Sequence, residues 1–213
     1  AAPGAGWNTV TAPDASGNLA NLVDFNTGLG SGISLTVHDE LGVGSANSPW
    51  SGSPAFRPWV ASAATTDFFF VRSSDHPTGG VTLSGLDPQR TYRVEVVGSR
   101  SDAASRVFDL KVNHQFSDEL DSDAFNAYTQ GYVGHQVMTW RQVRAENGQI
   151  VVDLAPNASN QHGYLNALRV TDAEAQTVLF DLGDPAYRTP GRWNNIAAPD
   201  SGGTGGPGHR ILS

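Results

Sequence analysis

Residues 81–96 read VTLSGLDPQRTYRVEV, in which Val81-Thr82-Leu83 and Tyr92-Arg93-Val94-Glu95-Val96 flank the segment Gly85-Leu86-Asp87-Pro88-Gln89. Alternation of apolar and polar residues is typical of a half-buried β-strand. An Asp-Pro pair favours a turn. The stretch therefore predicts two β-strands separated by a turn.

The same pattern recurs along the chain. Ile33–Val37 alternates in the same way, and in Asp67–Val71 the aspartate is followed by a wholly apolar run, as in a central strand. Asn147-Gly148 joins two further strands and is the strongest short signal for a hairpin. Helical periodicity is nearly absent, which favours an all-β sandwich or barrel. The other predicted strands are Val107–Val112, Gln136–Val143, Gln149–Leu154, Tyr164–Val170 and Val178–Leu182.

Composition excludes several classes of function. The 213 residues carry a net charge of −8, which argues against nucleic acid and anionic membranes as partners. No apolar run is long enough to span a bilayer, so no membrane insertion is expected. There is no cysteine, so neither disulfides nor thiol catalysis is expected.

Five motifs, taken in order, resemble a known family. The sequence is similar to the jelly-roll modules, related to galactose-binding-like domains, of secreted bacterial proteins; such modules are often appended to SGNH-type hydrolases or stand in cell-surface proteins. The motifs are WNTVTAPDASGNLANLVD (7–24), TGLGSGISLTV (27–37), DFFFV (67–71), LSGLDPQRTYRVEVVGSR (83–100) and GYLNALRV (163–170). The resemblance implies an antiparallel β-sandwich of jelly-roll type and an extracellular or cell-surface location in bacteria.

One departure from the family pattern concerns the first strand. Such modules open with an apolar strand and Asp-Phe-Gly before the Trp-Asn motif, whereas here a matching strand, Val178–Leu182, follows the module. GRWNNIAAPDSG (191–202) then repeats GWNTVTAPDASG (6–17), with Trp193 following Trp7 by 186 residues. We therefore divide the chain into a module at 1–182 and a Gly/Pro-rich tail at 183–213.

The displaced strand has three interpretations. It completes its own module, as in a circular permutation, or it completes a neighbouring molecule by strand addition. The third is that the chain is one period of a tandem array. The candidate assembly residues are Val178, Phe180, Leu182 and Trp193.

No catalytic set is evident in the sequence. VLFDLGDP (178–185) imitates the strand and Gly-Asp-Ser of an SGNH hydrolase, but Pro185 occupies the position of the nucleophile. There is no Gly-x-Ser-x-Gly elbow. We therefore expect a protein that is not an enzyme and requires no cofactor.

Two acidic segments are the candidates for structural calcium. Asp121 and Asp123 lie in a segment whose spacing partly imitates a calcium loop but lacks the glycine and glutamate of an EF-hand; a solvated acidic loop is the favoured interpretation. Asn21 and Asp24 precede the Thr27-Gly28 turn and are a second candidate, by analogy with related sandwich folds.

Sugar binding requires exposed aromatic planes and a few polar side chains. Two predicted surface loops, 47–64 and 116–134, supply them, although a loop that packs on its own sandwich would bury the same rings. We expect an extracellular recognition or attachment module for a polysaccharide or glycan. The alternative is a structural subunit that assembles with copies of itself into extracellular filaments or arrays, by β-strand exchange through the C-terminal segment. The candidate ligand-binding residues are Trp50, Arg57, Trp59, Tyr128 and Tyr132.

Overall fold

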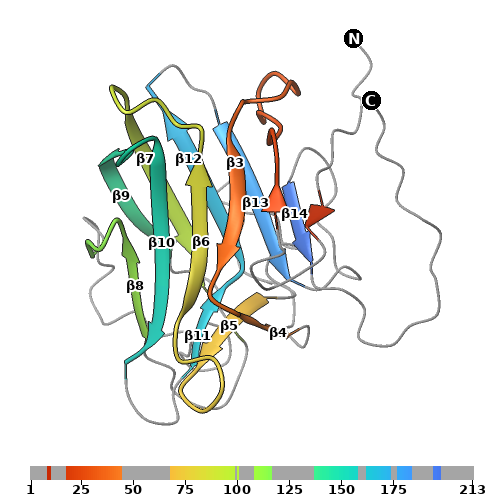
Figure 1. Ribbon diagram of the computed structural model, residues 1–213, viewed down its shortest axis with the longest axis vertical. Helices are drawn as coiled ribbons and strands as arrows, with labels where there is room; N and C mark the ends of the chain where they lie inside the picture. Colours follow the sequence, from red (N-terminus) through yellow and green to blue (C-terminus); the bar gives the residue numbers. More distant parts are fainter. Residues whose placement is uncertain are drawn as a thin grey trace, which may run out of the picture.

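The computed structural model describes nine segments of the chain: residues 9–10, 18–44, 68–98, 100, 108–116, 137–157, 162–173, 177–183 and 194–197. Within these residues every regular element is a β-strand, so the predicted all-β class is confirmed. No helix in this part of the chain is long and apolar enough to cross a membrane. Two large sheets face each other and a smaller sheet lies at one end (Figure 1).

The first sheet has six strands. Its order in space is β1 (Thr9–Val10), β14 (Asn194–Ala197), β13 (Thr177–Gly183), β12 (Ala167–Asp172), β7 (Thr91–Val97) and β9 (Val137–Arg144). The four strands from β13 to β9 are antiparallel, whereas β13, β14 and β1 run parallel to one another.

The second sheet is antiparallel and has five strands. Its order is β2 (Asn18–Leu19), β3 (Ser34–His38), β6 (Gly79–Ser84), β10 (Gln149–Pro156) and β8 (Phe108–Val112). The third sheet consists of β11 (His162–Leu165), β5 (Phe68–Arg72) and β4 (Gly42–Gly44).

The core lies between the first two sheets. Val94 of β7 and Leu168 of β12 face it from the first sheet, and Leu35 of β3 and Ile150 of β10 from the second; all four are fully buried. Each such side chain contributes about 1.5–3 kcal/mol by leaving water. The apolar and polar residues from which these strands were predicted therefore face the core and the solvent in turn.

The turn at residues 85–90, between β6 and β7, connects the two large sheets. β6 belongs to the second sheet and β7 to the first, so these consecutive strands do not form a hairpin. Leu86 in the turn is buried at the end of the core. Gly85 has a φ of 83°, and a Cβ there would lie 2.4 Å from the carbonyl oxygen of Gly32. Only glycine suits this position, where the turn passes close to the β2–β3 loop.

The GYLNALRV motif forms a corner. The single strand predicted from Tyr164 to Val170 is two strands, because the chain leaves the third sheet as β11 and enters the first as β12. Asn166 lies between them and is fully buried. Its N–H donates to Val97 and its carbonyl accepts from Leu182, both at 2.9 Å.

The wholly apolar run of the sequence is the middle strand of the third sheet. Phe68 and Phe70 of β5 stand opposite Gly44 and Gly42 of β4. A Cβ at Gly42 would lie 2.2 Å from the Phe70 ring, and one at Gly44 would lie 2.4 Å from the Phe68 ring. The glycines of β4 therefore provide the space in which the two phenylalanine rings lie.

Candidate functional site

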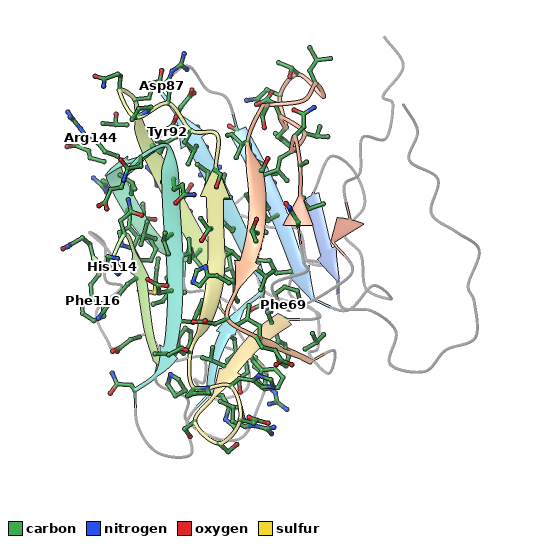
Figure 2. The ribbon with its side chains drawn as sticks, viewed as in Figure 1. Phe69, Asp87, Tyr92, His114, Phe116 and Arg144 are labelled. Atoms are coloured by element: carbon green, nitrogen blue, oxygen red, sulfur yellow. The ribbon has the colours of Figure 1, made fainter. Side chains whose placement is uncertain are left out.

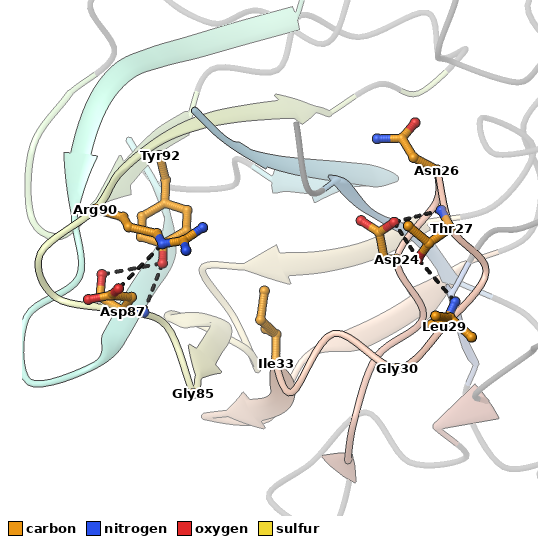
Figure 3. Close-up of a pocket in the computed structure, with 10 residues that line it drawn as sticks. All are labelled: Asp24, Asn26, Thr27, Leu29, Gly30, Ile33, Gly85, Asp87, Arg90 and Tyr92. Atoms are coloured by element: carbon orange, nitrogen blue, oxygen red, sulfur yellow. Dashed lines mark hydrogen bonds and ion pairs between the residues drawn. The ribbon is translucent and has the colours of Figure 1, made fainter. Parts of the chain in front are cut away.

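A pocket opens at the end of the sandwich where the two large sheets are joined (Figure 3). We call it the end pocket; it lies between the loop 24–30 and the segment 85–92, and its volume is about 690 Å³. Ile33, which is 4% exposed, lies between the two walls. The volume falls within the roughly 300–1,000 Å³ typical of small-molecule sites.

Asp24 organises the first wall. Its Oδ1 accepts hydrogen bonds from the N–H and the hydroxyl of Thr27, at 2.7 and 2.8 Å. Its Oδ2 accepts from the N–H of Thr177 at 2.7 Å. Asp24 is 3% exposed, so its carboxylate stabilises the loop 24–30 from the buried side. Leu29, in the same loop, is 69% exposed.

The second wall is built on Asp87, Arg90 and Tyr92. The N–H of Asp87 donates to the Tyr92 hydroxyl at 2.8 Å, and this hydroxyl donates to the Asp87 carbonyl at 3.3 Å. Arg90 donates to the buried carboxylate of Asp172 at 2.6 Å and to Asp87 at 3.3 Å. Burial raises the pKa of the Tyr92 phenol above its ordinary value, so the neutral hydroxyl persists to high pH.

The two walls offer complementary polar groups. The side chains of Asp87 and Arg90 are 48% and 37% exposed and present an acceptor and a donor on one side. On the other side lies the exposed amide of Asn26, whose Nδ2 donates to the Thr177 hydroxyl at 3.4 Å, while the Thr27 hydroxyl is held by Asp24 (Figure 3). None of the described residues that line the pocket is a serine, cysteine, histidine or lysine. The arrangement suits the binding of a polar, multiply hydroxylated molecule.

A second polar group lies in the middle of the second sheet. The Nδ1 of His38 is 2.9 Å from the Thr82 hydroxyl, and its Nε2 is 3.0 Å from the Asp153 carboxylate. The ring lies over Gly80, where a Cβ would be 2.8 Å from Nε2. Although the residue types match a hydroxyl–imidazole–carboxylate triad, β6 is paired on both sides here, which occupies the backbone N–H groups that an oxyanion would need.

A third cluster, of aromatic and cationic side chains, gathers on the third sheet. The rings of His162 and Tyr164 are stacked with centroids 6.1 Å apart. Phe70 meets His76 edge-on at 5.8 Å, and Arg72 lies 5.6 Å from the Phe70 ring centroid. Figure 2 shows Phe69 toward this end of the sandwich and Asp87 and Tyr92 at the opposite end.

The aromatic ligand-binding residues predicted from the sequence are not among those the structure describes. The paired residues Gly44 and Phe68 of the third sheet bound the segment that carries Trp50, Arg57 and Trp59. The predicted site residues that lie outside the described residues are Trp50, Arg57, Trp59, Asp121, Asp123, Tyr128, Tyr132 and Trp193.

The other predicted residues are distributed over two places. Val178, Phe180 and Leu182 lie on β13, each at most 1% exposed, and β13 pairs with β12 of the same chain. Asn21 accepts a hydrogen bond from the N–H of Gly32 at 3.0 Å. Among the described residues no group of three or more histidines or carboxylates could hold a metal ion. The calcium hypothesis therefore stays a prediction.

Asp24, predicted as a calcium candidate, lines the end pocket, but its other residues were missed by sequence reasoning, although a signal existed. Asn26, Thr27 and Leu29 lie in or next to one family-like motif, and Asp87 and Arg90 lie in another. No family model, curated protein or solved structure matches the chain. The site must therefore be interpreted from its own chemistry.

Proposed function

We propose that the protein is an extracellular, non-catalytic module that binds carbohydrate in the end pocket. The observation that carries the proposal is that Asp87 and Arg90 on one wall and Asn26 on the other line the same pocket. Carboxylate, guanidinium and amide groups supply the acceptors and donors that sugar hydroxyls require. The family resemblance supports the extracellular or cell-surface location.

The apolar part of the pocket fits the same class of ligand. Leu29, 69% exposed, provides an apolar surface for the C–H face of a sugar ring, and Ile33, 4% exposed, lies buried between the walls. Tyr92 is 3% exposed and is held by Asp87, so it supports the wall and does not offer a stacking plane. The ligand is therefore held mainly by hydrogen bonds in a shallow polar site.

A non-catalytic role agrees with the residue types. The sequence places Pro185 where an SGNH hydrolase would carry its serine. The described residues that line the pocket combine no nucleophile with a histidine base. A broad esterase and glycosidase assay is expected to be negative. Turnover that Asp87→Asn abolishes would contradict the non-catalytic role.

A glycan array followed by calorimetry on the full chain tests the proposal, with and without calcium. Asp87→Asn keeps the shape of the side chain and removes its charge, so it should weaken binding. The matched control is Asp75→Asn, on the turn of the third sheet, where Asp75 pairs with Arg72. Absence of binding to every polysaccharide would reject the function.

A second pair of variants distinguishes the end pocket from the aromatic loop. Trp50→Ala and Trp59→Ala leave the pocket residues intact. If they abolish binding and Asp87→Asn does not, carbohydrate recognition stands but its site is the loop 45–67. The reverse outcome assigns the ligand to the end pocket.

A further inference from the structure

The two copies of the Trp-Asn motif lie side by side as parallel strands. β1 pairs with β14 through Thr9↔Asn195 and Val10↔Ile196. Each pair joins residues 186 positions apart, which is the spacing of the two motif copies in the sequence. The copies are therefore in register, and each paired residue stands opposite its own equivalent.

The two copies differ in their place in the first sheet, because β14 pairs with β13 and β1 does not. β14 runs parallel to β13, with Asn195 opposite Asp181 and Ile196 opposite Leu182. β1 lies outside β14, at the edge of the first sheet. Ladder hydrogen bonds are made by the backbone and do not depend on side-chain identity. The N-terminal copy can therefore occupy the same place, with Thr9 opposite Asp181.

We infer that the edge of β13 is a docking site for the Trp-Asn motif, and that the second copy of the motif in each chain binds this site in another copy of the protein. When β14 leaves, β1 closes the edge of its own sheet. β14 then enters beside β13 of a second chain, in the same parallel register. Each chain has one docking site and two motifs that fit it.

The structure identifies β14, and not β13, as the segment that exchanges. β13 pairs with β12 over five residues, and Val178, Phe180 and Leu182 are buried in the core. Its first residue is also held by Asp24. Among the described strands, β14 pairs with β13 and β1 alone. The connection 184–193 has ten residues and spans at most about 35 Å, enough to reach an adjacent chain.

The first experiment asks whether β1 can occupy the docking site within one chain. The protein has no cysteine, so Thr9→Cys with Asp181→Cys gives a single reporter pair. With β14 in place the two positions are two strand spacings apart, about 9.6 Å, which is beyond the roughly 7 Å limit for a disulfide. Asn195→Pro with Ile196→Pro removes the N–H groups that β14 offers to both neighbours. The yield of the intrachain disulfide should then rise several-fold.

Its matched control is a double proline outside the motif, Gly205→Pro with Gly206→Pro. This change should leave the disulfide yield at the level of the parent pair. If the prolines in β14 produce no more disulfide than the control, β1 does not fit the docking site and the inference is overturned.

The second experiment asks whether β14 enters a second chain. A chain carrying Asp181→Cys is mixed with a chain carrying Asn195→Cys, and covalent dimers are quantified after mild oxidation. The dimer yield should increase with protein concentration and exceed that of Asn195→Cys mixed with Asp75→Cys, which measures random collisions. A chain carrying both Asp181→Cys and Asn195→Cys should close an internal disulfide and so report the register.

The outcomes separate clearly. A mixed dimer above the collision control supports exchange between copies of the protein. A closed internal disulfide without any mixed dimer overturns it, whatever the first experiment gives. If the chain carrying both Asp181→Cys and Asn195→Cys forms no internal disulfide, the register between β13 and β14 is wrong and the inference is overturned.

Discussion

The carboxylate of Asp24 accepts a hydrogen bond from the backbone N–H of Thr177 at 2.7 Å, across 153 residues of sequence. The N–H of Phe25 donates to the Thr177 carbonyl at 2.6 Å, so the same loop contacts both backbone groups of one residue. This loop is a wall of the end pocket. These two hydrogen bonds therefore hold the first residue of β13 against the loop that forms one wall of the candidate binding site.

Asp24→Ala should destabilise the protein strongly. The substitution leaves the N–H and hydroxyl of Thr27 and the N–H of Thr177 without their acceptor. We expect a loss of about 3 kcal/mol in the free energy of unfolding, because these are hydrogen bonds to a buried charged group. Urea unfolding measures it, with Glu40→Ala, at an exposed position, as the control. Equal stability of the two variants would show that Asp24 does not hold the loop.

Gly80→Ala should also destabilise, but through steric overlap. A Cβ at this position would lie 2.1 Å from the Val152 carbonyl oxygen and 2.8 Å from the His38 ring. We expect a loss of about 2 kcal/mol, as for overpacked sites, together with loss of the contact between His38 and Asp153.

Gly32→Ala is the informative comparison, since a Cβ there meets nothing within 4 Å and only its φ of 77° opposes the change. Gly32→Ala should therefore lower the free energy of unfolding by about 1 kcal/mol, through backbone strain alone. Thermal unfolding ranks the two variants; a larger loss for Gly32→Ala would contradict the packing account.

Because of Tyr92, we expect the free energy of unfolding to fall at alkaline pH. Its pKa is raised in the folded protein, mainly by burial, so the folded state holds the phenolic proton more tightly than the unfolded chain does. The contribution is complete below the ordinary tyrosine pKa of about 10 and is lost as pH rises from there through the folded value.

Tyr92→Phe isolates this effect. The variant should be about 1 kcal/mol less stable at pH 7, because the hydrogen bonds with Asp87 are lost. Above pH 10 its free energy of unfolding should fall less steeply than that of the parent protein. Urea unfolding from pH 7 to 11 gives both curves, and parallel curves would contradict the prediction.

Leu29→Ser should separate binding from folding. The side chain is 69% exposed, so its removal should change the free energy of unfolding by no more than about 0.5 kcal/mol. If Leu29 supports the sugar face, affinity for the ligand should fall about threefold to tenfold, the equivalent of one or two buried methylenes. Calorimetry and urea unfolding on one preparation measure both. Unchanged affinity would remove Leu29 from the site.

Local patterns were sufficient for most strands. The alternation of Ile33–Val37 corresponds to β3. Asn147-Gly148 forms a turn between β9 and β10 with both residues at positive φ, 51° and 78°, but the predicted hairpin is wrong, because β9 belongs to the first sheet and β10 to the second. These features depend on residues close in sequence. The corner at Asn166 was missed because apolar residues continue on both sides of it while the partner strand changes.

The site could not be predicted in the same way. Its two walls, around Thr27 and Asp87, are about sixty residues apart in the chain, and they meet only because the 85–90 turn crosses between sheets. Sequence reasoning placed ligand binding on exposed aromatic loops, where composition gives a local signal. It had no local signal for β1, whose pairing with β14 depends on where the other end of the chain lies.

The pairing of Gly44 with Phe68 has an evolutionary consequence. These residues close the third sheet across an intervening segment of 23 residues, 45–67. Loop closure depends only weakly on length, so that doubling such a segment costs about 0.6 kcal/mol. Insertions and replacements can therefore accumulate between these two residues while the framework is inherited unchanged. The position is a natural grafting point, at which related modules can diversify and an engineer can introduce a new recognition sequence.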